Sequence, residues 1–230
     1  MGVYEYCVNM AKALGWKNVE LSNVKVNGTL VEEGSNSTAG IYYKTDNLKG
    51  QFVISAKVVC KLNETSSMLY VLQDKNAEFV DFLDLLDERF LELTKEKWNS
   101  RKWWKDGDIE NEDDLAEKYK GLVEKVKVCK ESKKKVPVMK VLLGNNFKFK
   151  DCDNTEISGE KLKELSTSSE EFVATIVMNF KQMNLPLNKN KRFGCQVCGV
   201  NLKFDKVSKA NEEDSDYDEV EEKEWEAADE

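Results

Sequence analysis

The chain has 230 residues, of which 40% are hydrophobic and 10% aromatic, enough apolar material for the core of one large domain or two small ones. It contains no histidine, which excludes Ser-His and Cys-His nucleophile pairs, imidazole general bases and histidine-ligated metals. The net charge of −8 is uneven, because residues 211–230 hold twelve acidic residues and one lysine. The preceding 210 residues carry 34 basic and 31 acidic side chains, so a mildly basic body precedes an acidic tail.

The acidic tail, which we place at residues 210–230, is predicted to be disordered. A segment with high net charge and few apolar residues cannot bury enough surface to fold. Two interpretations of it stay open. It is either a solvated tail without a specific role, or a segment that competes for a cationic groove or contacts a protein partner.

The cysteine pattern and the N-terminus bear on where the protein works. Six cysteines are scattered over the chain, which does not resemble a disulfide framework. Residues 1–16 lack the basic-then-apolar layout of a signal peptide. No window approaches the roughly 18 continuous apolar residues of a membrane helix. We therefore expect an intracellular protein with no membrane partner.

Elements of the first third are mostly strands. Residues 1–16 fit a short helix, and from Val19 the apolar residues alternate with polar ones. Asn27-Gly28 is a turn signal inside that alternating run. Residues 51–62 are rich in β-branched side chains and predict a clear strand. We expect three strands joined by tight turns.

Two amphipathic helices are predicted in the middle of the chain. Residues 76–98 carry apolar side chains at helical spacing, with aspartates and glutamates on the other face. Residues 112–129 repeat the pattern more weakly. Both apolar stripes favour core packing over a cofactor site. Together they predict a helical insert at about residues 76–130.

Period-two alternation returns after the insert. It predicts strands at residues 136–143, 147–150, 171–183 and 191–204, with a helical turn or two at 159–165. Three strands, a helical segment and three or four more strands predict an α+β, mainly β fold. We expect an OB-fold-like antiparallel barrel at residues 1–209, with the inserted helix between its third and fourth strands closing the open end.

Cys195 and Cys198 form the single CxxC of the chain, within "KRFGCQVCGVNLKF". Tetrahedral zinc without histidine usually needs a second such pair, and none is present. On a strand, side chains three positions apart point to opposite faces. We therefore predict two small buried apolar residues and no metal, with a zinc module as the alternative that metal analysis would test.

The segment "KWNSRKWWK" at 97–105 combines three tryptophans with four cations. Adjacent indoles at the end of an amphipathic helix cannot all face inward, and exposed indoles among cations suit stacking on unpaired bases. Packing of Trp98 against the barrel is an equal alternative. The candidate binding residues of this segment are Trp98, Arg101, Lys102, Trp103, Trp104 and Lys105.

Further basic-aromatic clusters support the same binding function. "FKFK" at 147–150 is ordinary alternation, with the rings inward and the lysines outward. Lysine outnumbers arginine 32 to 3, which suits diffuse attraction to a phosphate backbone better than base reading. The remaining candidate residues are Tyr42, Tyr43, Lys44, Lys189, Lys191, Arg192 and Phe193.

No motif predicts an enzyme or a cofactor. The chain has no Walker P-loop, no GxGxxG, no HExxH and no carboxylate pair spaced for a two-metal nuclease. Residues 106–114 are acidic but break the order of an EF-hand loop. We expect a non-catalytic protein without catalytic or metal-binding residues.

The strand order, the inserted helices, the acidic tail and the closing segment "FVATIVMNFKQMNLPLNKNKRFGCQVCGVNLKF" resemble single-stranded-DNA-binding proteins of tailed phages and large DNA viruses. The resemblance implies sequence-independent binding of single-stranded DNA in replication, recombination or repair, at a nuclear or cytoplasmic replication site of a host cell. It also implies a tail that covers the empty groove and contacts replication proteins. Family tails often end on an aromatic residue, whereas Trp225 lies five residues before Glu230.

The main alternative is a non-catalytic scaffold whose acidic tail binds a basic partner protein. The preference between DNA and RNA and any self-association stay open.

Overall fold

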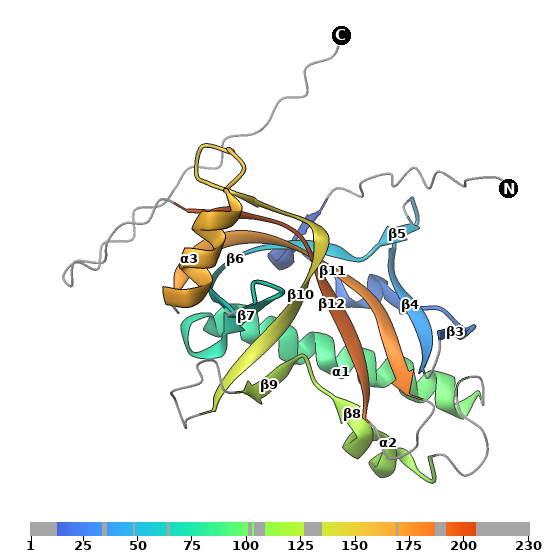
Figure 1. Ribbon diagram of the computed structural model, residues 1–230. Helices are drawn as coiled ribbons and strands as arrows, with labels where there is room; N and C mark the ends of the chain where they lie inside the picture. The colour runs from blue at the N-terminus through green and yellow to red at the C-terminus, as the bar shows by residue number, and fades with distance from the viewer. Residues whose placement is uncertain are drawn as a thin grey trace, which may run out of the picture.

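The computed structural model describes residues 13–33, 36–47, 49–63, 65–100, 103, 109–126, 135–168, 170–186 and 192–205. Figure 1 shows a strongly curved sheet, with helix α1 crossing behind its lower part and helix α3 beside its upper end. The expected α+β, mainly β fold is confirmed. None of the helices in the described ranges is long and apolar enough to cross a membrane.

The strands are β1 (Leu14–Gly15), β2 (Val24–Val26), β3 (Val31–Glu33), β4 (Asn36–Lys44), β5 (Lys49–Gln51), β6 (Val53–Leu62), β7 (Met68–Leu72), β8 (Tyr119–Lys120), β9 (Val123–Val126), β10 (Val136–Lys150), β11 (Phe172–Pro186) and β12 (Phe193–Phe204). The α-helices are α1 (Ala77–Asn99), α2 (Glu112–Lys118) and α3 (Gly159–Ser168). Short 3-10 turns occupy Trp16–Asn18, Leu21–Asn23 and Gln73–Lys75.

Five strands are paired in a closed ring. β6 pairs with β7, β7 with β10, β10 with β12, β12 with β11, and β11 again with β6. Every one of these pairings is antiparallel except that of β10 with β12, which is parallel. Along the chain, the five ring strands are β6, β7, β10, β11 and β12. The first of them, β6, lies between the second (β7) and the fourth (β11), and the third, β10, lies between the second (β7) and the fifth (β12).

The ring has an apolar interior because its strands alternate. In β6, Ile54, Ala56 and Val58 are buried, while the side chains between them are more exposed. α1 adds its own apolar stripe to this core, and the ring of Phe90 lies 6.4 Å from that of Phe180 on β11. Burial of one such side chain contributes about 1.5–3 kcal/mol, so the stripe of α1 stabilises the ring substantially.

β11 changes partner along its length. Its first half pairs with β6, and from Gln182 onward it pairs with β4, where Gln182 lies opposite Gly40. The register of β11 against β12 shifts between Phe180 and Gln182, at the point where the other edge of β11 changes from pairing with β6 to pairing with β4. β4 also pairs with β2, β3 and β5, so the sheet continues beyond the ring.

Several expected elements differ from those observed. The predicted helix 112–129 ends at Lys118, and part of the remainder forms strand β9. The valines at both ends of β9 lie opposite the start of β10, and β-branched residues of this kind fit a paired strand. Strand β7 was not predicted. The insert from α1 to β9 therefore lies between the second and third ring strands, and α3 is the helix between the third and fourth. Of the helix predicted at 1–16, residues 1–12 lie outside the described residues, and Leu14–Gly15 is a strand.

Candidate nucleic-acid interface

A cation–ring–cation row crosses the outer face of β6, β7 and β10. Tyr70 on β7 lies directly opposite Lys61 on β6 and Lys140 on β10. Strand alternation turns all three side chains away from the core, since the residues on both sides of each one are buried, as Leu69 and Val71 are beside Tyr70. Directly opposite Cβ atoms lie about 4.5–5.5 Å apart, so both lysine side chains start next to the Tyr70 side chain, and the Lys140 ammonium extends to Glu124, 3.4 Å away.

Two asparagines fix the register of this row. Asn63 follows β6, and its side-chain oxygen accepts a hydrogen bond of 2.9 Å from the backbone N–H of Met68 at the start of β7. At the other end, the Asn76 amide donates to the carbonyls of Val59 on β6 and Leu72 on β7, at 2.9 and 2.6 Å. A one-residue slip would turn Tyr70 inward, so these contacts determine which face the ring occupies.

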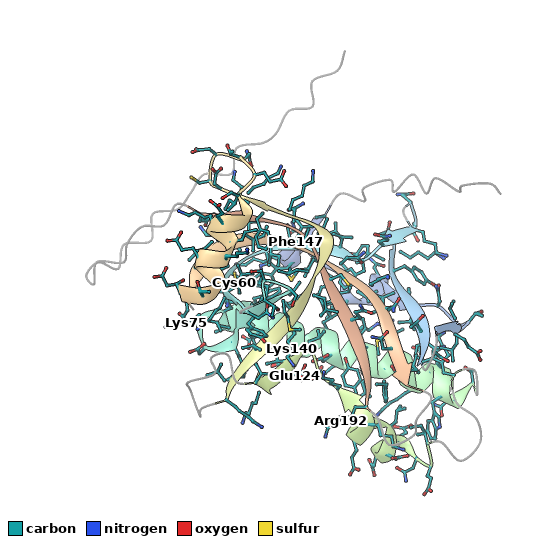
Figure 2. The ribbon with its side chains drawn as sticks, in the orientation of Figure 1. Cys60, Lys75, Glu124, Lys140, Phe147 and Arg192 are labelled. Atoms are coloured by element: carbon teal, nitrogen blue, oxygen red, sulfur yellow. The ribbon has the colours of Figure 1, made fainter. Side chains whose placement is uncertain are left out.

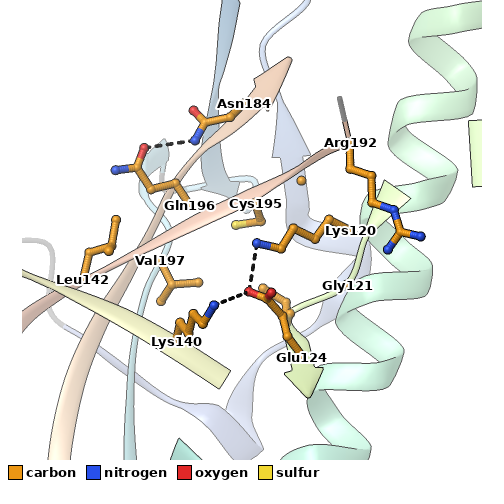
Figure 3. A pocket seen from close by; sticks show the side chains of 12 residues that line it. Lys120, Gly121, Glu124, Lys140, Leu142, Asn184, Arg192, Cys195, Gln196 and Val197 are labelled. Atoms are coloured by element: carbon orange, nitrogen blue, oxygen red, sulfur yellow. Dashed lines mark hydrogen bonds and ion pairs between the residues drawn. The ribbon is translucent and has the colours of Figure 1, made fainter. Parts of the chain in front are cut away.

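A pocket of about 340 Å³ lies beside the row, where the first halves of β10 and β12 separate. Figure 3 shows β9 and β10 below it and β12 crossing it. Lys140 belongs both to the row and to the lining of the pocket. The full lining is Lys120, Gly121, Leu122, Glu124, Lys140, Leu142, Asn184, Arg192, Gly194, Cys195, Gln196 and Val197.

The pocket has an excess of positive charge. Lys120 and Lys140 both pair with one oxygen of Glu124, at 2.8 and 3.4 Å (Figure 3). Partial burial raises the pKa of Glu124, but the hydrogen bonds and charges of the two lysines lower it by more than burial raises it. The pKa of Glu124 therefore lies below its ordinary value. Figure 2 shows Arg192, an exposed residue directly before β12, below Lys140 and Glu124. Three cations and one carboxylate make the lining net positive.

An amide cluster covers the opposite wall. The amide nitrogen of Gln182 donates to the oxygens of Asn184 and Gln196, each at 3.1 Å, and Asn184 donates to Gln196 at 3.4 Å. Asn184 and Gln196 line the pocket, and Gln182 is buried behind them. The cluster presents hydrogen-bonding groups to a ligand without adding charge.

Asp87 on α1 holds the segment that carries Lys120. Its carboxylate accepts a 2.6 Å hydrogen bond from the Tyr119 hydroxyl and a 2.8 Å bond from the Leu122 N–H. Burial raises the pKa of Asp87 from 3.8 to about 6, against the lowering effect of these two bonds, and Asp84 raises it further. The Tyr119 ring packs on Phe193, 5.5 Å between centroids, which joins this segment to β12.

Only some of the residues predicted from the sequence meet on a surface. Tyr42 is half-buried on β4, and the Lys49 ammonium lies 4.7 Å from the centroid of its ring. Lys44 lies directly opposite Lys49 in the pairing of β4 with β5, and it is exposed. Gln51 on the same face is uncharged and accepts a hydrogen bond from Asn179 of β11. This bond connects the small cluster to the ring of five strands.

Three predicted stacking residues lie in the core, so the expectation that their rings are accessible is wrong. Tyr43 is 6% exposed, because alternation turns it to the opposite side of β4 from Tyr42, where it stacks on Phe52 at 5.9 Å. Phe193 is 3% exposed against Tyr119. Trp103 is 5% exposed within the hydrophobic core.

Trp98, in the last turn of α1, is half-buried and packs against the core. This agrees with the alternative in which Trp98 packs against the barrel. The other predicted residues lie outside the described residues: Arg101, Lys102, Trp104, Lys105, Lys189 and Lys191. The structure therefore brings Arg192 to the pocket, and it groups Tyr42 and Lys44 on β4.

The CxxC lies within one continuous strand, β12, as predicted. Cys195 packs against the core, and burial raises its pKa well above the ordinary value. Cys198 lies opposite Asn179 on the outer face. The described residues contain no group of three or more cysteine, aspartate or glutamate side chains placed to hold a metal ion.

Sequence reasoning missed Lys61, Tyr70, Lys120 and Lys140. The alternation in "MLYVL" places Tyr70 on the other face of the strand from the leucine and valine beside it. This pattern would have identified Tyr70 as an outward-facing ring. The lysines give no comparable signal, because their grouping depends on which strands pair.

No protein-family model matches this chain, and no curated protein matches it. Among solved structures, it is similar to a single-stranded DNA-binding protein from bacteriophage Enc34. The two share 13% sequence identity with a TM-score of 0.35, over 78% of this chain and 89% of the phage chain.

Proposed function

We propose that this protein binds single-stranded DNA without sequence preference and that its ring of five strands is an OB-fold barrel. The pairing order of the ring, with a helix between the third and fourth strands, supports this assignment. OB-folds bind oligonucleotides on the face of strands two and three, flanked by the loops that join strands one to two and four to five. Here these strands are β7 and β10, and the second loop includes Lys189, Lys191 and Arg192.

The observation that carries the proposal is the row of Lys61, Tyr70 and Lys140 on that face. An aromatic ring stacks on any base, and each stack contributes about 1–3 kcal/mol by truncation. Cations on both sides of the ring attract the phosphates that flank a stacked base. The combination requires no particular base, which suits sequence-independent binding.

Other parts of the chain extend the proposed surface. Tyr42 with Lys49 and Lys44 forms a second ring with cations on β4. The cluster at 97–105 remains a proposed contact through Trp98 and the residues that follow it, and Trp103 instead stabilises the fold. The acidic tail competes for the basic surface or contacts replication proteins. In this proposal the protein acts in replication, recombination or repair and catalyses no reaction.

The alternative function, a scaffold that binds a basic protein through the acidic tail, requires no binding face on the ring. Its signature would be binding to a basic protein that equals or exceeds binding to DNA and is lost with the tail. No contact among the described residues favours it over the DNA-binding proposal.

The test is fluorescence anisotropy of a labelled oligo(dT) over a series of salt concentrations. Tyr70→Ala should weaken binding by about 5- to 150-fold, the equivalent of one lost stack. Tyr70→Phe should keep most of the affinity, because stacking needs the ring. Lys61→Gln should reduce the slope of log K against log salt by about 0.7, the value for one phosphate contact on a single strand.

Lys57→Gln is the matched control. Lys57 lies on the same strand and the same side of β6 as Lys61, but opposite Thr175 of β11 and paired with Asp205 at 2.8 Å. It should leave the salt slope unchanged. The proposal fails if wild-type protein does not bind oligo(dT), if binding does not depend on salt, or if the Lys57 and Lys61 variants behave alike. Duplex DNA and RNA competitors measure the preference among nucleic acids.

A further inference from the structure

We infer that the pocket between β10 and β12 accepts one unstacked nucleotide of the bound strand, with the base inside and the phosphate at the rim by Arg192. This inference rests on the proposed function, because the pocket begins at Lys140, the last residue of the row on the binding face. A strand that stacks on Tyr70 would pass the mouth of the pocket as it continues toward β12.

The dimensions and walls suit a single base. A volume of about 340 Å³ lies at the small end of the range of ligand sites, too small for two stacked bases with their sugars. Leu142, 38% exposed, supplies most of the apolar surface for the faces of a ring, and Val197, 4% exposed, adds a small part. Asn184 and Gln196 supply amides for its edge. A base needs both kinds of wall, because it has two apolar faces and a polar edge.

The charges distinguish a nucleotide from a simple anion. Lys120, Lys140 and Arg192 attract a phosphate, and three cations against one carboxylate leave a net positive lining. Glu124, held between the two lysines, would repel a phosphate that came close to it. Both lysines contact Oε1 of Glu124, so its other oxygen would accept a hydrogen bond from the exocyclic amino group of cytosine, which thymine lacks. At this one position of the strand the pocket therefore favours an amino-bearing base, with its phosphate kept at the Arg192 side, whereas stacking on Tyr70 accepts any base.

The wall beneath the base is fixed in place before any ligand arrives. Asp87 anchors both Tyr119 and Leu122 by hydrogen bonds. Gly194 approaches the carbonyl of Lys120 so closely that a Cβ atom there would lie 2.6 Å from it. Rigid walls of this kind reduce the entropy that a ligand loses on binding.

The experiment titrates the full chain with dCMP, dTMP, deoxyribose 5-phosphate and inorganic phosphate, and follows the side-chain amide signals of Asn184 and Gln196 by NMR. We expect saturable shifts with dCMP, and weaker binding by about tenfold or more for dTMP and for the two ligands without a base, the effect of one hydrogen bond to a charged group. Equal binding of inorganic phosphate and dCMP would reduce the pocket to an anion site and overturn the inference.

Leu142→Trp fills the pocket and should abolish the dCMP shifts. Val173→Trp is the matched control, since Val173 is 40% exposed on the outer face of β11 and does not line the pocket. Circular dichroism and thermal melting show whether both variants fold. The inference is overturned if folded Leu142→Trp protein binds dCMP as the wild type does, or if the wild type shows no saturable shift.

The same samples separate this inference from the proposed function. Wild-type protein that binds oligo(dT) with the expected salt dependence but does not bind dCMP would refute the pocket assignment alone. Protein that binds dCMP but not oligo(dT) would refute the proposed function and leave a nucleotide site. Loss of both would refute both.

Discussion

Replacing Asp87 with asparagine should change how the stability of the protein depends on pH. Asp87 is mostly buried between α1 and the segment 119–122, where burial raises its pKa from 3.8 to about 6. A carboxyl whose folded pKa exceeds its unfolded value binds its proton more tightly in the folded state. Its contribution to stability is therefore complete below about pH 4 and is lost as the pH rises through about 6.

The size of this effect follows from the shift. One pKa unit corresponds to about 1.4 kcal/mol, so a shift of this size gives an upper value of about 3 kcal/mol between about pH 4 and about pH 7. Asparagine has no proton to lose in this range. The difference in unfolding free energy, wild type minus Asp87→Asn, should therefore fall by up to about 3 kcal/mol as the pH rises.

Urea unfolding followed by tryptophan fluorescence at several pH values measures this difference. Subtracting the variant from the wild type removes the titration of the other carboxylates, which the two proteins share. Asp81→Asn, six residues earlier on the exposed face of α1, is the control and should show the pH dependence of the wild type, because Asp81 is not among the groups that shift the pKa of Asp87. A difference for Asp87→Asn that stays flat, or rises with pH, would contradict the assigned burial of this carboxyl.

Three further outcomes are expected. Gly194→Ala should lose about 1–3 kcal/mol in urea unfolding, because its Cβ would meet the Lys120 carbonyl, whereas Gly144→Ala, with open space around it, should stay within about 0.5 kcal/mol; equal losses would contradict the close approach. Trp103→Ala should lose about 3–5 kcal/mol of stability and keep its affinity for oligo(dT), and the reverse pattern would mean that the indole is a binding residue. Removal of 211–230 should strengthen oligo(dT) binding at low salt in the anisotropy assay, and unchanged or weaker binding would argue against competition by the tail.

The long alternating strands could be predicted from the sequence, and the short ones could not. Residues 51–62 and 171–183 alternate over many positions, so their burial pattern identifies them, and both are confirmed as β6 and β11. β7 has five residues after a polar loop, too few for a period to stand out. At 112–129 the apolar spacing fits a helix, but β9 gains more from pairing with β10, a contact that local spacing does not reveal.

The candidate site was less predictable because it depends on pairing between distant strands. Tyr42 and Tyr43 are neighbours, so alternation shows that one faces inward without showing which. Their assignment is decided by the packing of Tyr43 on Phe52. Lys61 and Lys140 flank Tyr70 only once β6, β7 and β10 are in register. Composition indicated a mildly basic body with aromatic residues before an acidic tail, and the fold selects which basic and aromatic residues share a face.

The pairing of β6 with β11 also sets the order in which the chain can assemble. Phe172 meets Cys60 across 112 residues, so this contact closes a long loop and makes folding slow, on the scale of milliseconds to seconds. Helix α1 and the β6–β7 hairpin form from local contacts and can assemble early. During synthesis, one edge of β6 waits until β11 has left the ribosome, and an unpaired edge can join another chain. Aggregation during expression should therefore fall when fewer chains are synthesised at once, because the joining of two open edges depends on their concentration, without any change in the stability of the folded protein.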